Sequence, residues 1–175
     1  MWRTWRYSRA LAFLAGLMLA AAFRPPPELC CGEIFSARVS RIHDGDTVSV
    51  TADDGRVLKI RLYGIDAPES GQAFGRVAKK HLTGLLRGQR VRVESFYLDD
   101  YQRRVALLYY QDHRLANADL VAAGLAWYAP QFCRKTPVCP RIKALEKNAR
   151  QQKLGLWRDK EPRPPWEWRR DSGRK

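Results

Sequence analysis

Apolar and polar residues alternate along much of the chain after residue 33, which is the period of half-buried β-strands. Three such segments precede residue 64, and the turn Asp54-Gly55 separates the second from the third. In the third segment the leucine and isoleucine residues share one face, and Arg61 lies on the other. The pattern predicts strands over 34–42, 46–51 and 57–63.

In three later segments the apolar spacing is that of helices. One apolar stripe consists of Phe74, Val77, Ala78, Leu82 and Leu85. Helices are expected over 72–86, 116–123 and 141–153. Strand-like composition returns over 90–96 and 104–110. This order of elements predicts an α+β domain built as a five-stranded OB-type β-barrel that helices close.

The length of 175 residues allows one domain with a real core, plus ends that lie outside it. We expect a Pro-rich spacer over 23–33, the barrel domain over 34–157, and a basic tail over 158–175. The tail is rich in Pro, Trp and Arg. We expect it to be mostly disordered, although Trp166 and Trp168 could stack on bases or pack loosely on the domain.

The formal net charge of +14 points to a polyanionic partner. Nucleic acid is the leading candidate, and membrane headgroups are an alternative. A basic surface without any specific ligand would give the same net charge.

The first 22 residues have the pattern of a secretory signal peptide. Three arginines precede an uncharged run over 10–23, which contains the small residues Ala20, Ala21 and Ala22 near its end. The run is shorter than the roughly 20 residues that span a bilayer. We therefore expect cleavage after Ala22 and a periplasmic or extracellular protein, with inner-membrane anchoring by residues 10–23 as the alternative.

Four cysteines in an exported chain favour oxidation. Cys133 and Cys139 bracket a short loop, and this spacing favours a local disulfide. Cys30 and Cys31 are adjacent, so bonding to each other would strain the backbone. They could stay reduced, or one could pair outside the domain. The histidine and cysteine spacing gives little support to a zinc site.

Carboxylates and arginines occur together at three points of the chain. Asp44 and Asp46 flank a glycine before a predicted strand, and Asp66 follows the next strand. Oxygen ligands of this kind suit calcium or magnesium. However, Asp54-Gly55 shows that Asp-Gly pairs also arise as plain turns.

Arg61 and Arg103 could each hold two phosphate oxygens in a bidentate fork. Glu69 follows Pro68, which restricts the loop, and could activate a water molecule near a metal ion. Exposed arginines and loop acids are common, so each residue alone favours an ordinary surface role.

The order and spacing of these motifs change that assessment. The segments Asp-Gly-Asp-Thr at 44–47, Arg-Leu-Tyr-Gly-Ile-Asp-Ala-Pro-Glu at 61–69 and Asp-Asp-Tyr-Gln-Arg at 99–103 closely resemble the thermonuclease family typified by staphylococcal nuclease. The resemblance extends from about Phe35 to Trp157. It implies an OB barrel with three helices and calcium-dependent cleavage of DNA and RNA.

The resemblance also implies a role for each motif residue. Asp46, Asp66 and the backbone carbonyl of Ala67 would bind Ca²⁺, with Asp44 behind them. Arg61 and Arg103 would bind phosphate, and Glu69 would act as general base. The aromatic residues implied at the substrate site are Tyr101 beside the phosphate, and Tyr128 or Phe132 against a base.

The chain departs from the family pattern in several places. Gln102 and Arg104 replace glycines that flank the arginine in the best-known member. Many relatives have Thr in place of Ala67, a change that a backbone ligand survives. The segment after Glu69 is shorter, and the Cys133 to Cys139 loop is distinctive.

The sequence therefore predicts an exported, monomeric, calcium-dependent endonuclease that leaves 3′-phosphate ends on DNA or RNA. The main alternative is a non-catalytic nucleic-acid-binding module of the same fold. A third possibility is an envelope protein that binds anionic surfaces through its tail.

Overall fold

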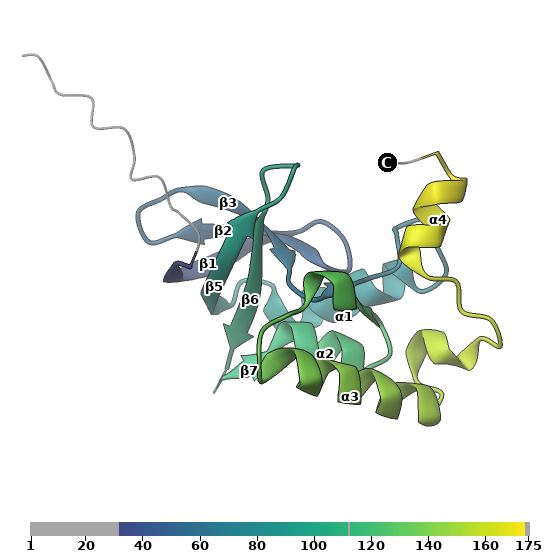
Figure 1. The fold of residues 1–175 in the computed structure, drawn as a ribbon. Coiled ribbons are helices and arrows are strands. Elements are labelled where there is room, and N and C mark those ends of the chain that lie inside the picture. Colours follow the sequence, from purple (N-terminus) through teal and green to yellow (C-terminus); the bar gives the residue numbers. More distant parts are fainter. Residues whose placement is uncertain (1–31, 112, 174–175) are drawn as a thin grey trace, which may run out of the picture.

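The computed structural model describes residues 32–111 and 113–173, and its centre is a closed β-barrel (Figure 1). Five strands form the barrel: β1 (Ile34–Ile42), β2 (Thr47–Ala52), β3 (Val57–Leu62), β5 (Arg90–Leu98) and β6 (Arg104–Tyr110). Each matches a predicted strand to within two residues at either end. The α+β, OB-like fold predicted from the sequence is confirmed.

The barrel closes through the pairing of β3 with β6. The strand order is β3-β2-β1-β5-β6 with antiparallel neighbours, and β3 then pairs with β6 in parallel. In this closing pair Arg61 lies opposite Val105, and in the pair of β2 with β3 Arg61 lies opposite Thr47. The two registers bring the ends of three strands to one rim, beside Arg61.

The interior of the barrel contains the side chains that the period of two predicted. Val48, Val50 and Ile60 are fully buried. β6 departs from this period, because its consecutive residues Leu107 and Leu108 are both fully buried and point to opposite faces of the strand. Burying a side chain of this size stabilises a fold by about 1.5–3 kcal/mol. The core therefore holds in place the strands that carry the polar rim.

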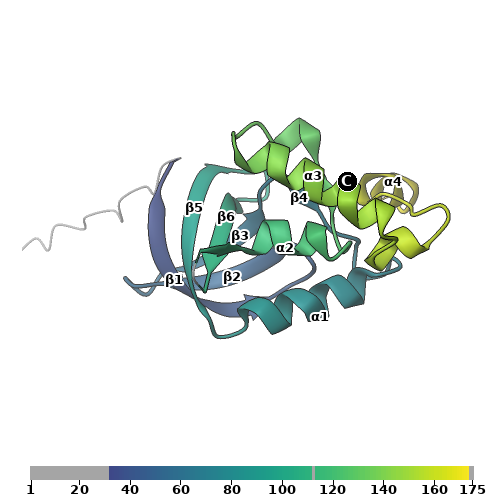
Figure 2. The same ribbon diagram turned by 90° about the horizontal axis from the view of Figure 1, so that it is seen from below.

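Three helices pack around the barrel (Figure 2). They are α1 (Gly75–Leu86), α2 (Ala116–Ala122) and α3 (Val138–Gln151). α1 begins three residues later than predicted because Phe74 has a left-handed φ of 65°. Val77 was expected in the apolar stripe of α1, but it is 50% exposed.

Asn117 joins α2 to the barrel seam. The side chain is fully buried and accepts a hydrogen bond from the Leu108 amide at 3.1 Å. It also donates to the Tyr63 carbonyl at 2.9 Å. Unpaired buried polar groups are costly, so these bonds fix the position of the helix relative to the barrel.

Several short elements had no counterpart in the prediction. The short strands are β4 (Ile65–Asp66), β7 (Arg114–Leu115) and β8 (Trp127–Tyr128). Two 3₁₀ helices span Pro130–Phe132 and Gly155–Arg158. β4 pairs with β8 in antiparallel fashion, so that Asp66 lies opposite Trp127.

The C-terminal tail differs from the expectation of disorder. Residues Pro165–Asp171 form α4, a fourth helix that lies apart from α1–α3 and beside the barrel rim (Figure 1). The Trp166 ring packs edge-on against Trp127, with ring centroids 5.5 Å apart. The Gln72 side chain donates to the Arg163 carbonyl at 2.6 Å. Composition alone predicted disorder, but tryptophan can anchor even a short helix when a ring is available to receive it.

The structure also contains the disulfide that the sequence favoured, between Cys133 and Cys139. The predicted signal peptide, most of the spacer, and Cys30 and Cys31 lie outside the described residues. Within 32–111 and 113–173, no helix is long and apolar enough to span a bilayer.

Candidate active site

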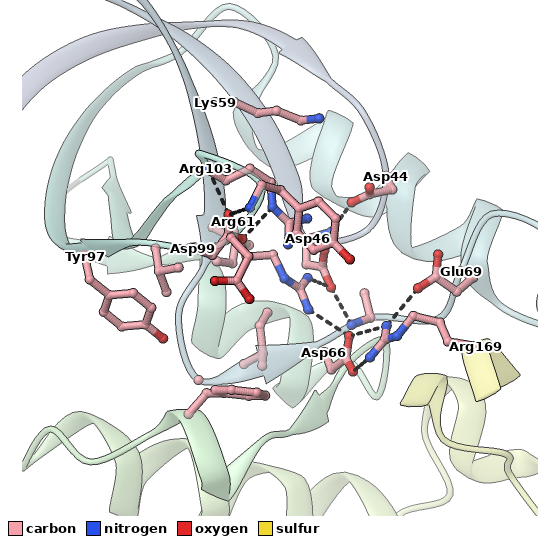
Figure 3. A pocket seen from close by; sticks show the side chains of 18 of the residues that line it. Asp44, Asp46, Lys59, Arg61, Asp66, Glu69, Tyr97, Asp99, Arg103 and Arg169 are labelled. Atoms are coloured by element: carbon pink, nitrogen blue, oxygen red, sulfur yellow. Dashed lines mark hydrogen bonds and ion pairs between the residues drawn. The ribbon is translucent and has the colours of Figure 1, made fainter. Parts of the chain in front are cut away.

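A pocket of about 550 Å³ opens at the rim where β3 and β6 meet (Figure 3). Arg61 comes from β3, and Arg103 immediately precedes β6. Asp46 immediately precedes β2, whose first residue pairs with Arg61. The barrel thus gathers residues from three separate motifs into one cavity.

Arg61 connects the two carboxylates predicted to bind metal. One guanidinium nitrogen forms an ion pair with Asp46, and another donates to Asp66 Oδ1 at 2.7 Å. Both carboxylates are buried, at 6% and 5% exposure. Burial lowers the pKa of Arg61 from its usual value, and the adjacent Asp66 carboxylate raises it in part.

Hydrogen bonds to the backbone hold these acids in position. Asp46 Oδ2 accepts a hydrogen bond from the Ala67 amide at 2.7 Å, which joins the residue after β4 to the loop before β2. Asp44 Oδ1 accepts the Asp46 amide at 3.0 Å. Asp44 therefore helps to hold the backbone of Asp46 in place.

The loop that carries Glu69 is tightly packed. The Glu69 amide donates to the Gln72 side chain at 3.1 Å, and the Gln72 amide donates back to the Glu69 carbonyl at 2.8 Å. A Cβ on Gly75 would lie 1.9 Å from that carbonyl oxygen, so only glycine fits there. The Glu69 side chain is 30% exposed and lines the pocket.

Arg103 is held by the turn that precedes β6. Asp99 accepts the Arg103 amide at 2.9 Å and its Nε at 2.7 Å. Burial alone would raise the pKa of Asp99, but these hydrogen bonds from Arg103 lower it below its usual value. Gln102 has a φ of 58°, so the chain keeps a backbone conformation that favours glycine at the position where the best-known member has one.

Two of the three predicted aromatic substrate contacts line the pocket. Tyr101 and Phe132 are 65% and 59% exposed there. Among the described residues that line the pocket, Tyr128 is absent. Tyr128 lies in β8, and its side chain packs against the hydrophobic core of the barrel. The geometry therefore favours Phe132 over Tyr128 as the residue that contacts a base.

Arg169 of α4 also enters the pocket, which the sequence motifs did not predict (Figure 3). Its guanidinium donates to both Asp66 oxygens, at 2.7 and 3.2 Å, and to Glu69 at 2.8 Å. These hydrogen bonds, led by those to Asp66, raise the pKa of Arg169 above its usual value. Arg169 and Asp66 are 103 positions apart in the sequence. A helix-starting Pro-Pro pair followed by Trp166 was the only available signal.

The donor atoms at the rim fit a hard cation. Among residues 32–111 and 113–173, no three acidic, histidine or cysteine side chains form a ready cluster for a metal. Instead, Asp46 and Asp66, which Arg61 bridges, provide carboxylate oxygens beside the backbone of Ala67. The Ala67 carbonyl could serve as a further oxygen ligand. An all-oxygen set of this kind suits calcium or magnesium.

Comparison with known proteins agrees with this geometry. The family model described as "Staphylococcal nuclease homologue" matches residues 59–159. A protein named "Uncharacterized endonuclease" from Escherichia coli O157:H7 is 41% identical over 143 residues, which cover 82% of this chain and 89% of the relative. A protein of the same name from Haemophilus influenzae is 38% identical over 141 residues, which cover 81% of this chain and 76% of the relative.

A further relative is named for its activity. The "Micrococcal nuclease" of Shigella flexneri is 38% identical over 146 residues, which cover 79% of this chain and 82% of the relative. The family model covers more than half of the chain and includes Arg61, Asp66, Glu69 and Arg103, but it begins after Asp46. The chain belongs to the staphylococcal nuclease family.

Proposed function

We propose that this protein is a calcium-dependent endonuclease that hydrolyses phosphodiester bonds of DNA or RNA. The observation that carries the proposal is the convergence of Asp46, Asp66, Arg61, Glu69 and Arg103 on one pocket. Family membership and the names of the relatives support the nuclease assignment. Calcium dependence rests on the all-oxygen donor set and on the resemblance.

In this proposal Asp46, Asp66 and the Ala67 carbonyl hold the calcium ion. When bound, the ion would supply positive charge against the non-bridging phosphate oxygens. Arg61 and Arg103 donate hydrogen bonds to the same phosphate and stabilise the charge that grows on its oxygens. Asp44 keeps Asp46 in place through the Asp46 amide.

Glu69 provides the proton acceptor. A water oxygen forms the new bond to phosphorus while one water proton passes to the Glu69 carboxylate. The bond from phosphorus to the 5′ oxygen breaks, and that oxygen takes a proton from solvent. The products are a 3′-phosphate end and a 5′-hydroxyl end. The packed loop from Glu69 to Gly75 limits where this carboxylate can point.

The charge of the chain supports a nucleic acid substrate. The net charge of +14 attracts a polyanion, and binding should weaken as salt increases. Tyr101 and Phe132 offer exposed rings at the pocket on which bases could stack. We further propose that the protein acts after export, which suits the disulfide between Cys133 and Cys139.

The proposal is tested by cleavage of single-stranded DNA with calcium and with chelator. We expect cleavage only with calcium, 3′-phosphate ends, and loss of cleavage in Asp66→Asn. Asp54→Asn is the matched control, because Asp54 lies in an exposed turn outside the pocket. Equal cleavage with calcium and chelator would contradict the metal assignment. Binding without cleavage would instead favour the non-catalytic module.

A further inference from the structure

α4 reaches the carboxylates of the proposed metal site through one residue. The Arg169 guanidinium faces Asp66 as a fork, with one nitrogen on each carboxylate oxygen, and the nitrogen on Oδ1 also bonds Glu69. It therefore lies between a proposed metal ligand and the proposed proton acceptor (Figure 3). Bidentate pairs of this kind are among the strongest side-chain hydrogen bonds.

The position of α4 is set by a neighbouring contact. Trp166 and Arg169 are three residues apart and thus lie on one face of the helix. Their partners, Trp127 and Asp66, lie opposite each other in the pairing of β8 with β4. Two side chains of the helix therefore contact two residues that face each other across the β4–β8 pair. Packing of Trp166 on Trp127 places Arg169 beside the carboxylate of Asp66.

The docked helix has limited support of its own. α4 spans seven residues, which is too short to be stable as an isolated helix. Pro165, the first residue of α4, is also buried, and the Gln72 side chain donates a hydrogen bond to the Arg163 carbonyl. Trp166 remains 37% exposed. A short helix at the edge of the fold, outside the strand pairings of the barrel, can leave the pocket without disturbing the barrel.

We propose that the C-terminal helix is an internal competitor of the metal ion, with Arg169 occupying the Asp66 and Glu69 carboxylates until calcium displaces it. This inference rests on the proposed calcium site. A guanidinium and a divalent cation cannot both take the facing lone pairs of Asp66, and their like charges repel. The same contact also occupies Glu69, so the docked tail blocks the metal ligand and the proton acceptor together.

The competition has a measurable size. If α4 is docked for about 90% of the time, the apparent Kd for calcium rises by about tenfold over that of the open site. The coupling is reciprocal, so calcium must release α4 by the same factor. Arg61 also contacts Asp66, but its backbone is part of β3, so undocking of α4 leaves Arg61 in the pocket.

The test is calcium titration of the full chain by calorimetry, with calcium alone as the probe. We expect Arg169→Gln to bind calcium about tenfold more tightly than the unchanged protein. Arg170→Gln is the matched control, because it removes the same charge from the same helix while its side chain is 73% exposed and its ion pair is with Asp171. Trp166→Ala keeps Arg169 but weakens docking, and should also tighten binding.

A second readout follows the helix itself. Hydrogen exchange of the α4 amides should accelerate when calcium is added to the unchanged protein. Equal or weaker calcium binding by Arg169→Gln, where the unchanged protein does bind calcium, would overturn the competition and leave the proposed function intact. Absence of calcium binding in all variants would overturn both.

Discussion

Arg61 and Arg169 make nearly the same contact from two different regions of the molecule. Both donate to the Asp66 carboxylate, at 2.7 Å in each case. Arg61 belongs to a strand that pairs on both sides, and its side chain is 16% exposed. Arg169 belongs to a seven-residue helix outside the barrel, and its side chain is 32% exposed.

The difference teaches that a contact does not define a role. The backbone behind each arginine decides whether the residue stays in the pocket. Arg61 stays at the rim whichever partner its guanidinium takes, because its backbone is part of β3, whereas Arg169 leaves when a short helix undocks. We therefore assign Arg61 to the permanent site and Arg169 to an exchangeable position.

The largest expected effect is on the barrel side of the comparison. Arg61→Gln should reduce the rate of DNA cleavage by about 10³-fold or more, because the variant loses charge stabilisation at the phosphate. The cleavage rate at saturating calcium is the measurement. Arg90→Gln is the control, since Arg90 is 59% exposed and pairs with Asp53 outside the pocket. If both variants lost a similar fraction of the cleavage rate, the loss would come from the lower overall charge and not from the position of Arg61.

A smaller effect is expected from the scaffold behind the rim. Asn117→Ala should lower the free energy of unfolding by on the order of 2 kcal/mol, because buried groups of Leu108 and Tyr63 lose their partner. Urea unfolding measures the change. Asn148→Ala, in an exposed stretch of α3, should stay within about 0.5 kcal/mol. If Asn117→Ala were equally neutral, the seam would not depend on this side chain.

The barrel could be predicted from the sequence because its physical cause is local and repeated. Alternation over five or more residues shows which face of a strand is buried, and the strands follow it closely. β4 and β8 are two residues each, so no period can reveal them. Their pairing depends on the fold already being formed around them.

The same distinction applies to the pocket. Asp46, Arg61 and Asp66 could be identified because the order and spacing of their motifs resemble the thermonuclease family. Arg169 could not, because its position depends on Trp166 finding the Trp127 ring across the folded structure. The position of Tyr128 could not be predicted for a related reason, since no periodic pattern indicates that it belongs to a two-residue strand beside the core.

In the proposed mechanism the barrel rim performs the chemistry and Glu69 takes the proton. This mechanism is tested most directly by single-turnover cleavage of DNA by Glu69→Gln at saturating calcium, with Glu161→Gln as the exposed control. We predict a loss of about 10²-fold or more in the cleavage rate, with DNA affinity changed by no more than a few-fold. A cleavage rate equal to that of the unchanged protein would contradict the account.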